Sequence, residues 1–229
     1  MDASAAPAAP AARRRLLGRA AVVVAAAALV VAGALAASQR VRFILGGALV
    51  NAGYRLQDHL ARYDLDHAGH DLRPDLIWDT FLQRNRLASS VRQAFPRSRY
   101  HPLIAMVVCM DARIDTNELT GDTRRFYYII RTAGSVLGER EEEMLELAVR
   151  NGVRVVVFTT HTDCAAERAA RDPAQRALYP RLVAGIAERE DREREFLSRP
   201  EIAERIRRGE LIVRYANVET GTEHLVPAR

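Results

Sequence analysis

The sequence predicts an α/β fold: a mainly parallel β-sheet of about four strands flanked by helices, preceded by an N-terminal hydrophobic leader helix. Three observations predict it. Short segments rich in β-branched and aromatic residues alternate with longer helix-favouring segments over the second half of the chain. One of the short segments, 153–161, is an apolar run, as strands buried in a parallel sheet are. Residues 20–37 form an uncharged apolar stretch.

The leader, residues 1–42, predicts a signal peptide or a membrane anchor. It carries six arginines against Asp2 alone. The stretch 20–37 is at the lower limit for a helix that crosses a bilayer, roughly 17 to 25 residues. The small residues Ala34-Leu35-Ala36 equally fit a cleavage site. Arginines before the stretch favour a cytoplasmic N-terminus and a membrane-anchored or exported, extracytoplasmic body. Arg13-Arg14-Arg15-Leu16-Leu17 resembles a twin-arginine export signal, without the usual Ser or Thr before the pair.

The body of the protein is formally neutral. Of the 34 basic and 29 acidic residues in the chain, 28 of each lie after residue 42. Basic residues are not interleaved with aromatics in any run, so we expect no nucleic-acid partner. A hydrophobic fraction of 48% supports one domain with a sizeable core.

Residues 43–98 are expected to form an N-terminal helical arm. Helical spacing covers 43–63 and 76–95, with the polar loop 64–75 between them. His67 and His70 lie in this loop, but no further ligand stands beside them, so we expect them to be solvated.

Residues 99–229 are expected to form the α/β domain. Gly152 stands where a glycine commonly follows the end of a helix. The pattern predicts strands at 102–110, 126–133, 153–161 and 211–219, and helices at 138–151, 172–197 and 200–208.

The two cysteines of the chain follow two of these strands. Cys109 ends the first strand, and His161 and Cys164 follow the third. Because the carboxyl ends of parallel strands meet at one edge of a sheet, the two thiols and the imidazole should converge. Such a set is what catalytic zinc uses, with a fourth position left open. A Cys109–Cys164 disulfide, a Cys–His nucleophile pair and plain buried cysteines remain as alternatives.

Three motifs carry a resemblance to a known family. C-M-D-A-R at 109–113, I-I-R-T-A-G at 129–134 and H-T-D-C at 161–164 resemble, in the same order, the C-x-D-x-R, R-N-A-G and H-x-x-C motifs of the β-class carbonic anhydrases. Segment 207–221 is similar to the closing strand and turn of that family. The three motifs in this spacing are specific, whereas each one alone is not.

The resemblance implies a zinc-dependent carbonic anhydrase, which hydrates carbon dioxide reversibly to bicarbonate by zinc-bound hydroxide. It implies Cys109, His161 and Cys164 as zinc ligands, with Asp111 and Arg113 as catalytic residues beside the metal. In this family the aspartate either accepts a hydrogen bond from the hydroxide or becomes a fourth ligand that closes the site. The resemblance also implies a homodimer or higher homo-oligomer, in which the helical arms embrace the neighbouring subunit.

Several positions depart from the family pattern. Ala165 replaces the glycine that usually follows the second cysteine, and it would be strained if the backbone there had a positive φ. Thr132 replaces the asparagine of R-N-A-G, and the bulky segment 126–128 contains Tyr127 and Tyr128, of which one should pack in the core. We therefore keep two alternatives: a zinc hydrolase of carbon disulfide or carbonyl sulfide on the same scaffold, and a catalytically impaired zinc-binding module whose cavity the tyrosines plug.

Overall fold

The computed structural model divides into two compact units, Met1–Ala88 and Ser89–Arg229. It describes residues 10–57, 60, 73–96, 101–121 and 127–228, with no description of the side chains of 10–18 and 35–36. His67, His70 and Phe126 therefore lie outside the described residues, as do the side chains of Arg13, Arg14 and Arg15.

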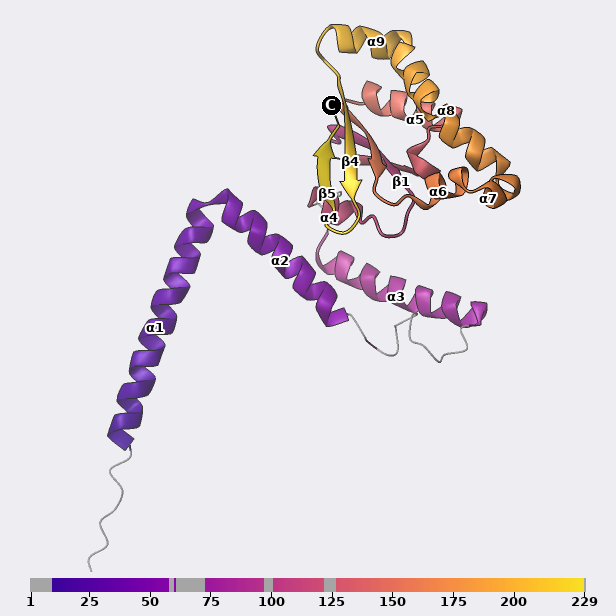
Figure 1. Cartoon of the computed structure of the whole chain (residues 1–229). Helices are drawn as coiled ribbons and strands as arrows, with labels where there is room; N and C mark the ends of the chain where they lie inside the picture. Colours follow the sequence, from indigo (N-terminus) through magenta and orange to yellow (C-terminus); the bar gives the residue numbers. More distant parts are fainter. Residues whose placement is uncertain (1–9, 58–59, 61–72, 97–100, 122–126, 229) are drawn as a thin grey trace, which may run out of the picture. The chain divides into compact units, whose positions relative to one another are not determined.

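The first unit is helical. α1 (Pro10–Ala37) and α2 (Gln39–Gln57) are followed by α3 (Pro74–Ala94), which continues into the second unit (Figure 1). α2 and α3 contain no buried side chain among the residues described. In the described part of the chain no helix is by itself long and apolar enough to span a membrane. The pair Arg19–Ala34 and Gln39–Gln57, which a sharp bend separates, has sufficient length and apolar composition when the two helices are taken together.

The second unit contains a five-stranded sheet in the order β2-β1-β3-β4-β5 (Figure 1). The first four strands are parallel to one another, and β5 pairs antiparallel with β4. The four predicted strands are confirmed with ends shifted by at most two residues, whereas β5 was not predicted. The strands are β1 (Ile104–Cys109), β2 (Tyr127–Thr132), β3 (Val155–His161), β4 (Ile212–Glu219) and β5 (His224–Pro227).

Helices flank this sheet. The single helix predicted over 172–197 is wrong, because the chain breaks at Tyr179, whose backbone is not helical (ψ 55°) and which precedes Pro180 at the start of the next helix. The short helix after Cys164 was not predicted. The described helices of the unit, besides the end of α3, are α4 (Thr116–Thr120), the 3₁₀ turn η1 (Ala133–Ser135), α5 (Glu139–Arg150), α6 (Ala165–Arg171), α7 (Pro173–Leu178), α8 (Pro180–Ser198) and α9 (Pro200–Arg207).

Two clusters of buried side chains form the core. The larger one packs Leu145 and Val149 of α5, Phe196 of α8 and Ile202 of α9 against apolar side chains of β1 and β3. A smaller cluster contains Cys109 and Cys164 and three other buried side chains, Met106, Val108 and Ile114. The two thiols therefore lie in an apolar environment.

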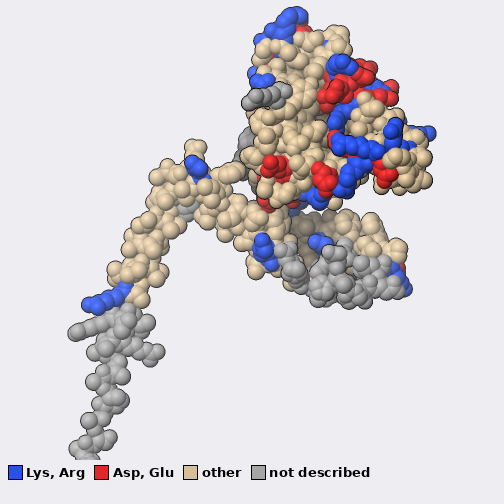
Figure 2. Space-filling view, viewed as in Figure 1, with Lys and Arg blue, Asp and Glu red and all other residues tan. Residues whose placement is uncertain are grey.

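Charges of both signs are interspersed on the surface of the second unit. Figure 2 shows basic and acidic side chains mixed over the face in view, whereas the described surface of α1 is nearly free of charge.

Two ion pairs join α5 to the start of α9 beside the larger core cluster. The Arg199 guanidinium donates hydrogen bonds to Glu142 (3.1 Å) and Glu146 (2.7 Å). Glu142 is fully buried, and this burial raises the pKa of its carboxyl group above the ordinary value, although Arg199 opposes the effect. For Glu146 the hydrogen bond from Arg199 is the stronger influence and lowers the pKa.

Replacing Arg199 by alanine should lower the free energy of unfolding by about 3 kcal/mol near neutral pH, because the Glu142 carboxylate is then buried without its cation. Since the pKa of Glu142 is higher in the folded than in the unfolded protein, the deficit should appear as the pH rises through the folded-state pKa and shrink at lower pH, where Glu142 is protonated. Urea unfolding at a series of pH values measures it.

The double variant Glu142→Gln/Arg199→Ala serves as the control, because it contains no buried unpaired charge at this position. It should be less destabilised than Arg199→Ala alone. A deficit that is the same at every pH would show that the buried carboxylate is not its cause.

Candidate metal centre

The ends of two neighbouring strands bring two thiols and an imidazole together. Cys109 is the last residue of β1, His161 is the last residue of β3, and Cys164 directly precedes α6. The Sγ atoms of the cysteines lie 4.0 Å apart, and one ligand atom from each of the three residues lies within 4.8 Å of the others. All three side chains are buried. The convergence expected from the sequence is confirmed.

The sulfur atoms are not bonded to each other. A disulfide holds its sulfurs about 2.0 Å apart, and both cysteines are free in this structure. Two thiolates on a tetrahedral zinc, each about 2.3 Å from the metal, would lie about 3.8 Å apart. The observed 4.0 Å is close to that separation.

His161 presents one nitrogen for ligation. Its Nδ1 lies 3.1 Å from the carbonyl oxygen of Thr162, so we assign the proton to Nδ1. Nε2 is buried, and within the described part of the chain it has no hydrogen-bond partner. A buried polar atom without a partner is costly, and a cation between Nε2 and the two thiols would remove that cost. The donor set therefore fits zinc.

The thiol of Cys164 has a raised pKa. Burial is the main cause, and backbone hydrogen bonds from Glu167 and Ala166 oppose it. Because the metal ligand is the thiolate, binding of a metal has to displace the proton from such a thiol.

Asp111 is held as a carboxylate beside these ligands. Arg113 donates from Nε to Oδ1 (3.0 Å) and from Nη2 to Oδ2 (2.8 Å), so both oxygens are engaged by one guanidinium. Its backbone N–H also donates to Oδ1 (3.0 Å). The hydrogen bonds from Arg113 hold the pKa of Asp111 far below its ordinary value. Arg131 of β2 fixes the backbone by donating to the carbonyl oxygen of Asp111 (2.7 Å).

An apolar cavity of about 260 Å³ opens next to Cys109 and Asp111. A water molecule occupies about 30 Å³ in the liquid, so the cavity has room for a small molecule of a few atoms. Apart from Asp111, its lining consists of apolar or aromatic residues, namely Cys109, Met110, Ala133, Ala165, Ala166, Ala169, Tyr179 and Leu182.

The sequence of the second unit matches a known family. The family model described as "Carbonic anhydrase" matches residues 104–227, more than half of the chain. The chain belongs to the β-carbonic anhydrase family. The match covers all five strands, both cysteines and His161.

Curated relatives and solved structures agree with this assignment. Beta-carbonic anhydrase 1 of Mycobacterium tuberculosis and that of Mycobacterium bovis are each 34% identical over 76 residues, which cover 33% of this chain and 47% of theirs. The chain thus spans about half the length of the curated relatives it matches. A tetrameric β-carbonic anhydrase from Sordaria macrospora (16% identity, TM-score 0.51) covers 67% of this chain and 96% of its own. A carbonic anhydrase from Streptococcus mutans (20% identity, TM-score 0.50) aligns with 66% of this chain over 97% of its own length. These structures share the fold.

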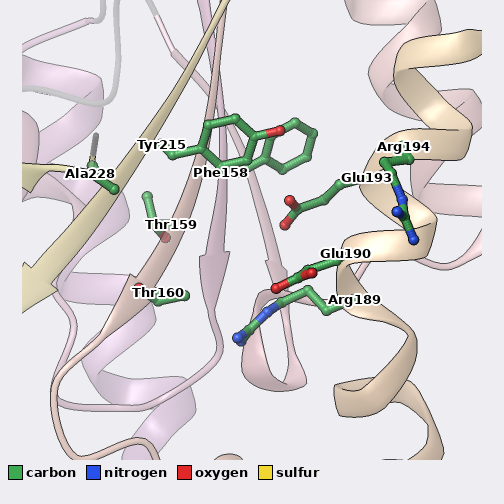
Figure 3. Close-up of a pocket in the computed structure, with 10 residues that line it drawn as sticks. Phe158, Thr159, Thr160, Arg189, Glu190, Glu193, Arg194, Tyr215 and Ala228 are labelled. Carbon is green, nitrogen blue, oxygen red and sulfur yellow. The ribbon is translucent and has the colours of Figure 1, made fainter.

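A larger cavity, of about 380 Å³, lies between the sheet and the second half of α8 (Figure 3). Phe158 and Tyr215 stack there with ring centroids 5.6 Å apart, and Figure 3 shows Glu190 and Glu193 on the helix opposite them. Burial raises the pKa of Glu193. This cavity has no lining residue in common with the one beside Cys109, and its wall on α8 carries charged side chains.

The tyrosines of β2 lie far from the ligands. Tyr127 and Tyr128 pair with Ile104 and Ala105 at the amino end of β1, whereas Cys109 pairs with Thr132. Tyr127 and Tyr128 lie five and four residues before Thr132, or about 16 Å and 13 Å along the strand. Tyr127 packs against the smaller core cluster, as predicted for one of the pair. The interpretation that these tyrosines plug the cavity of their own chain is wrong.

The two departures from the family motifs, Ala165 and Thr132, differ in their structural effect. Ala165 is the first residue of α6 and is not among the described residues with positive φ, so the strain considered for it does not arise. The positive φ of this loop (56°) is instead at Asp163. The hydroxyl oxygen of Thr132 is buried, with no hydrogen-bond partner in the part of the chain that is described.

Sequence reasoning missed several residues around the site. Asp163, Arg168, Tyr179 and Leu182 were not singled out, and Arg131 was noted only as part of a motif. An aspartate between two metal ligands was a signal that could have drawn attention to Asp163. Tyr179 and Leu182 gave no such signal, because they reach the cavity only through the packing of α8 on α6.

Proposed function

We propose that this protein is a zinc-dependent carbonic anhydrase that hydrates carbon dioxide reversibly to bicarbonate. The observation that carries the proposal is the buried Nε2 of His161, which has no hydrogen-bond partner in the described residues and lies with two free thiols beside an ionised Asp111. Membership of the β-carbonic anhydrase family supports it.

Cys109, His161 and Cys164 would hold the zinc ion, which when bound lowers the pKa of water in its open position to roughly 7. Asp111 is ionised and can accept a hydrogen bond from the hydroxyl group that would attack carbon dioxide. This hydrogen bond would fix the direction of the lone pairs on the hydroxyl oxygen. Arg113 keeps the carboxylate in place through a bidentate contact. The apolar cavity suits carbon dioxide, which has no net charge, and limits competing water.

Asp111→Asn and Arg113→Ala should each keep one zinc per chain and lose about 100-fold or more in carbon dioxide hydration, because the ligands remain but the acceptor or its orientation is lost. Metal analysis and stopped-flow hydration on the same preparation measure both quantities. Full activity in either variant would contradict the assigned roles.

The substrate is tested on the same preparation. Carbonyl sulfide and carbon disulfide are linear electrophiles like carbon dioxide, and an apolar cavity can admit all three. We expect carbon dioxide to be turned over fastest. Hydrolysis of carbon disulfide or carbonyl sulfide without hydration of carbon dioxide would identify a hydrolase, and zinc binding without any turnover would identify a non-catalytic module.

We also propose that the protein is a homodimer or higher homo-oligomer assembled through its helical arm. Large apolar side chains are exposed on α2 and α3, among them Phe43, Leu49, Trp78 and Phe81, and such surfaces usually mark interaction sites. The double variant Trp78→Ser/Phe81→Ser should shift the protein toward the monomer in light scattering. A wild-type protein that is monomeric at micromolar concentration would contradict the proposal.

We further propose that the leader exports or anchors the α/β domain outside the cytoplasm. The site supports a route for folded proteins, because two free thiols 4.0 Å apart could oxidise to a disulfide if they arrived unfolded and without metal in an oxidising compartment. Replacing Arg13 and Arg14 by lysine should therefore abolish export, measured by cell fractionation in a bacterial host. Unchanged export would exclude the twin-arginine route.

A further inference from the structure

We propose that Asp163 is a positioning residue that keeps Asp111 off the metal position and thereby keeps the site open. The inference rests on the proposed zinc site and carbonic anhydrase function. It concerns a residue that lies within the ligand loop, between His161 and Cys164.

One guanidinium links the two aspartates. Arg113 holds both carboxylate oxygens of Asp111 through Nε and Nη2. From its other side, Nη1 donates to Oδ2 of Asp163 (3.2 Å) and Nη2 to the backbone carbonyl oxygen of Asp163 (2.8 Å). A planar guanidinium with two anchored sides has a fixed orientation, and so has the carboxylate bound to it.

The local backbone places Asp163 for this contact. Its φ of 56° is in the left-handed region, which aspartate and asparagine tolerate better than most residues. Its second carboxylate oxygen, Oδ1, accepts a hydrogen bond from Arg168 of α6. Asp163 is therefore held between Arg113 and the helix that follows Cys164.

The contact with Asp163 should affect the position of Asp111 more than the stability of the fold. The side chains of Asp163 and Arg113 are 54% and 46% exposed, and exposed ion pairs contribute little to folding. Asp111, by contrast, has two possible partners, the guanidinium of Arg113 and the zinc ion, because carboxylates are good zinc ligands. If Arg113 is less firmly held, Asp111 is freer to leave it for the metal.

Asp163→Asn tests this proposal, because asparagine has the same shape and tolerates the same backbone but lacks the charge. Zinc affinity is measured on the metal-free protein by competition with a chelator, and carbon dioxide hydration on the zinc-loaded protein. We expect zinc to bind about fivefold more tightly, since Asp111 becomes a fourth ligand, and hydration to fall about tenfold. Weaker or unchanged zinc binding would overturn the proposal.

Two further variants separate positioning from structural damage. In Asp111→Asn/Asp163→Asn the gain in zinc affinity should vanish, because an amide is a poor zinc ligand; a persistent gain would overturn the proposal. Asp191→Asn removes another exposed aspartate that pairs with an arginine, Arg194 on α8, and it should leave affinity and hydration unchanged. The affinity comparison stands even if the wild-type protein hydrates no carbon dioxide, so failure of the proposed function is distinguishable from failure of this inference.

Discussion

The parallel pairing of β1 with β3 is the constraint on which the rest of the site depends. These strands are neighbours in the sheet, and their register pairs Val107 with Phe158, so Cys109 ends β1 close to the end of β3. His161 and Cys164 follow at the same edge. A chain that paired β1 with β4 instead would separate the two cysteines by a strand, which is about 5 Å more.

The apolar surroundings of the site make its polar groups interdependent. Thiols and an imidazole in a buried cluster have few partners other than one another, so a cation is the partner that satisfies all three. The charged side chains next to these ligands have partners of their own. Asp111 has its partner in Arg113, and Arg113 has a second one in Asp163, so this carboxylate need not turn to the metal for a counter-charge. With separate partners for the ligands and for the carboxylate, a bound metal would keep its fourth position open, as we propose.

Much of the fold and of the candidate site could be predicted from the sequence, because the strands that carry the site are short apolar runs with polar residues directly after them. The convergence of the three candidate ligands follows from that pattern, whereas the roles of Asp111 and Arg113 are implied only by the resemblance of the motifs to the family. β5 could not be predicted, because four residues after a tight turn show too little alternation. The position of Tyr127 and Tyr128 depends on the register between β2 and β1, which is set by packing and not by the composition of either strand. The contact of Asp163 with Arg113 joins residues fifty apart through a local positive φ that aspartate permits but does not require.

We propose that Cys109, His161 and Cys164 hold one zinc ion while Asp111 stays with Arg113. This arrangement can be tested by a crystal structure of the zinc-loaded protein, with anomalous diffraction recorded at the zinc absorption edge. We expect a single anomalous peak in this part of the protein, within about 2.3 Å of both sulfurs and 2.1 Å of Nε2 of His161, with the Asp111 carboxylate on the guanidinium of Arg113. A disulfide between the cysteines, or a peak that does not contact all three residues, would contradict it.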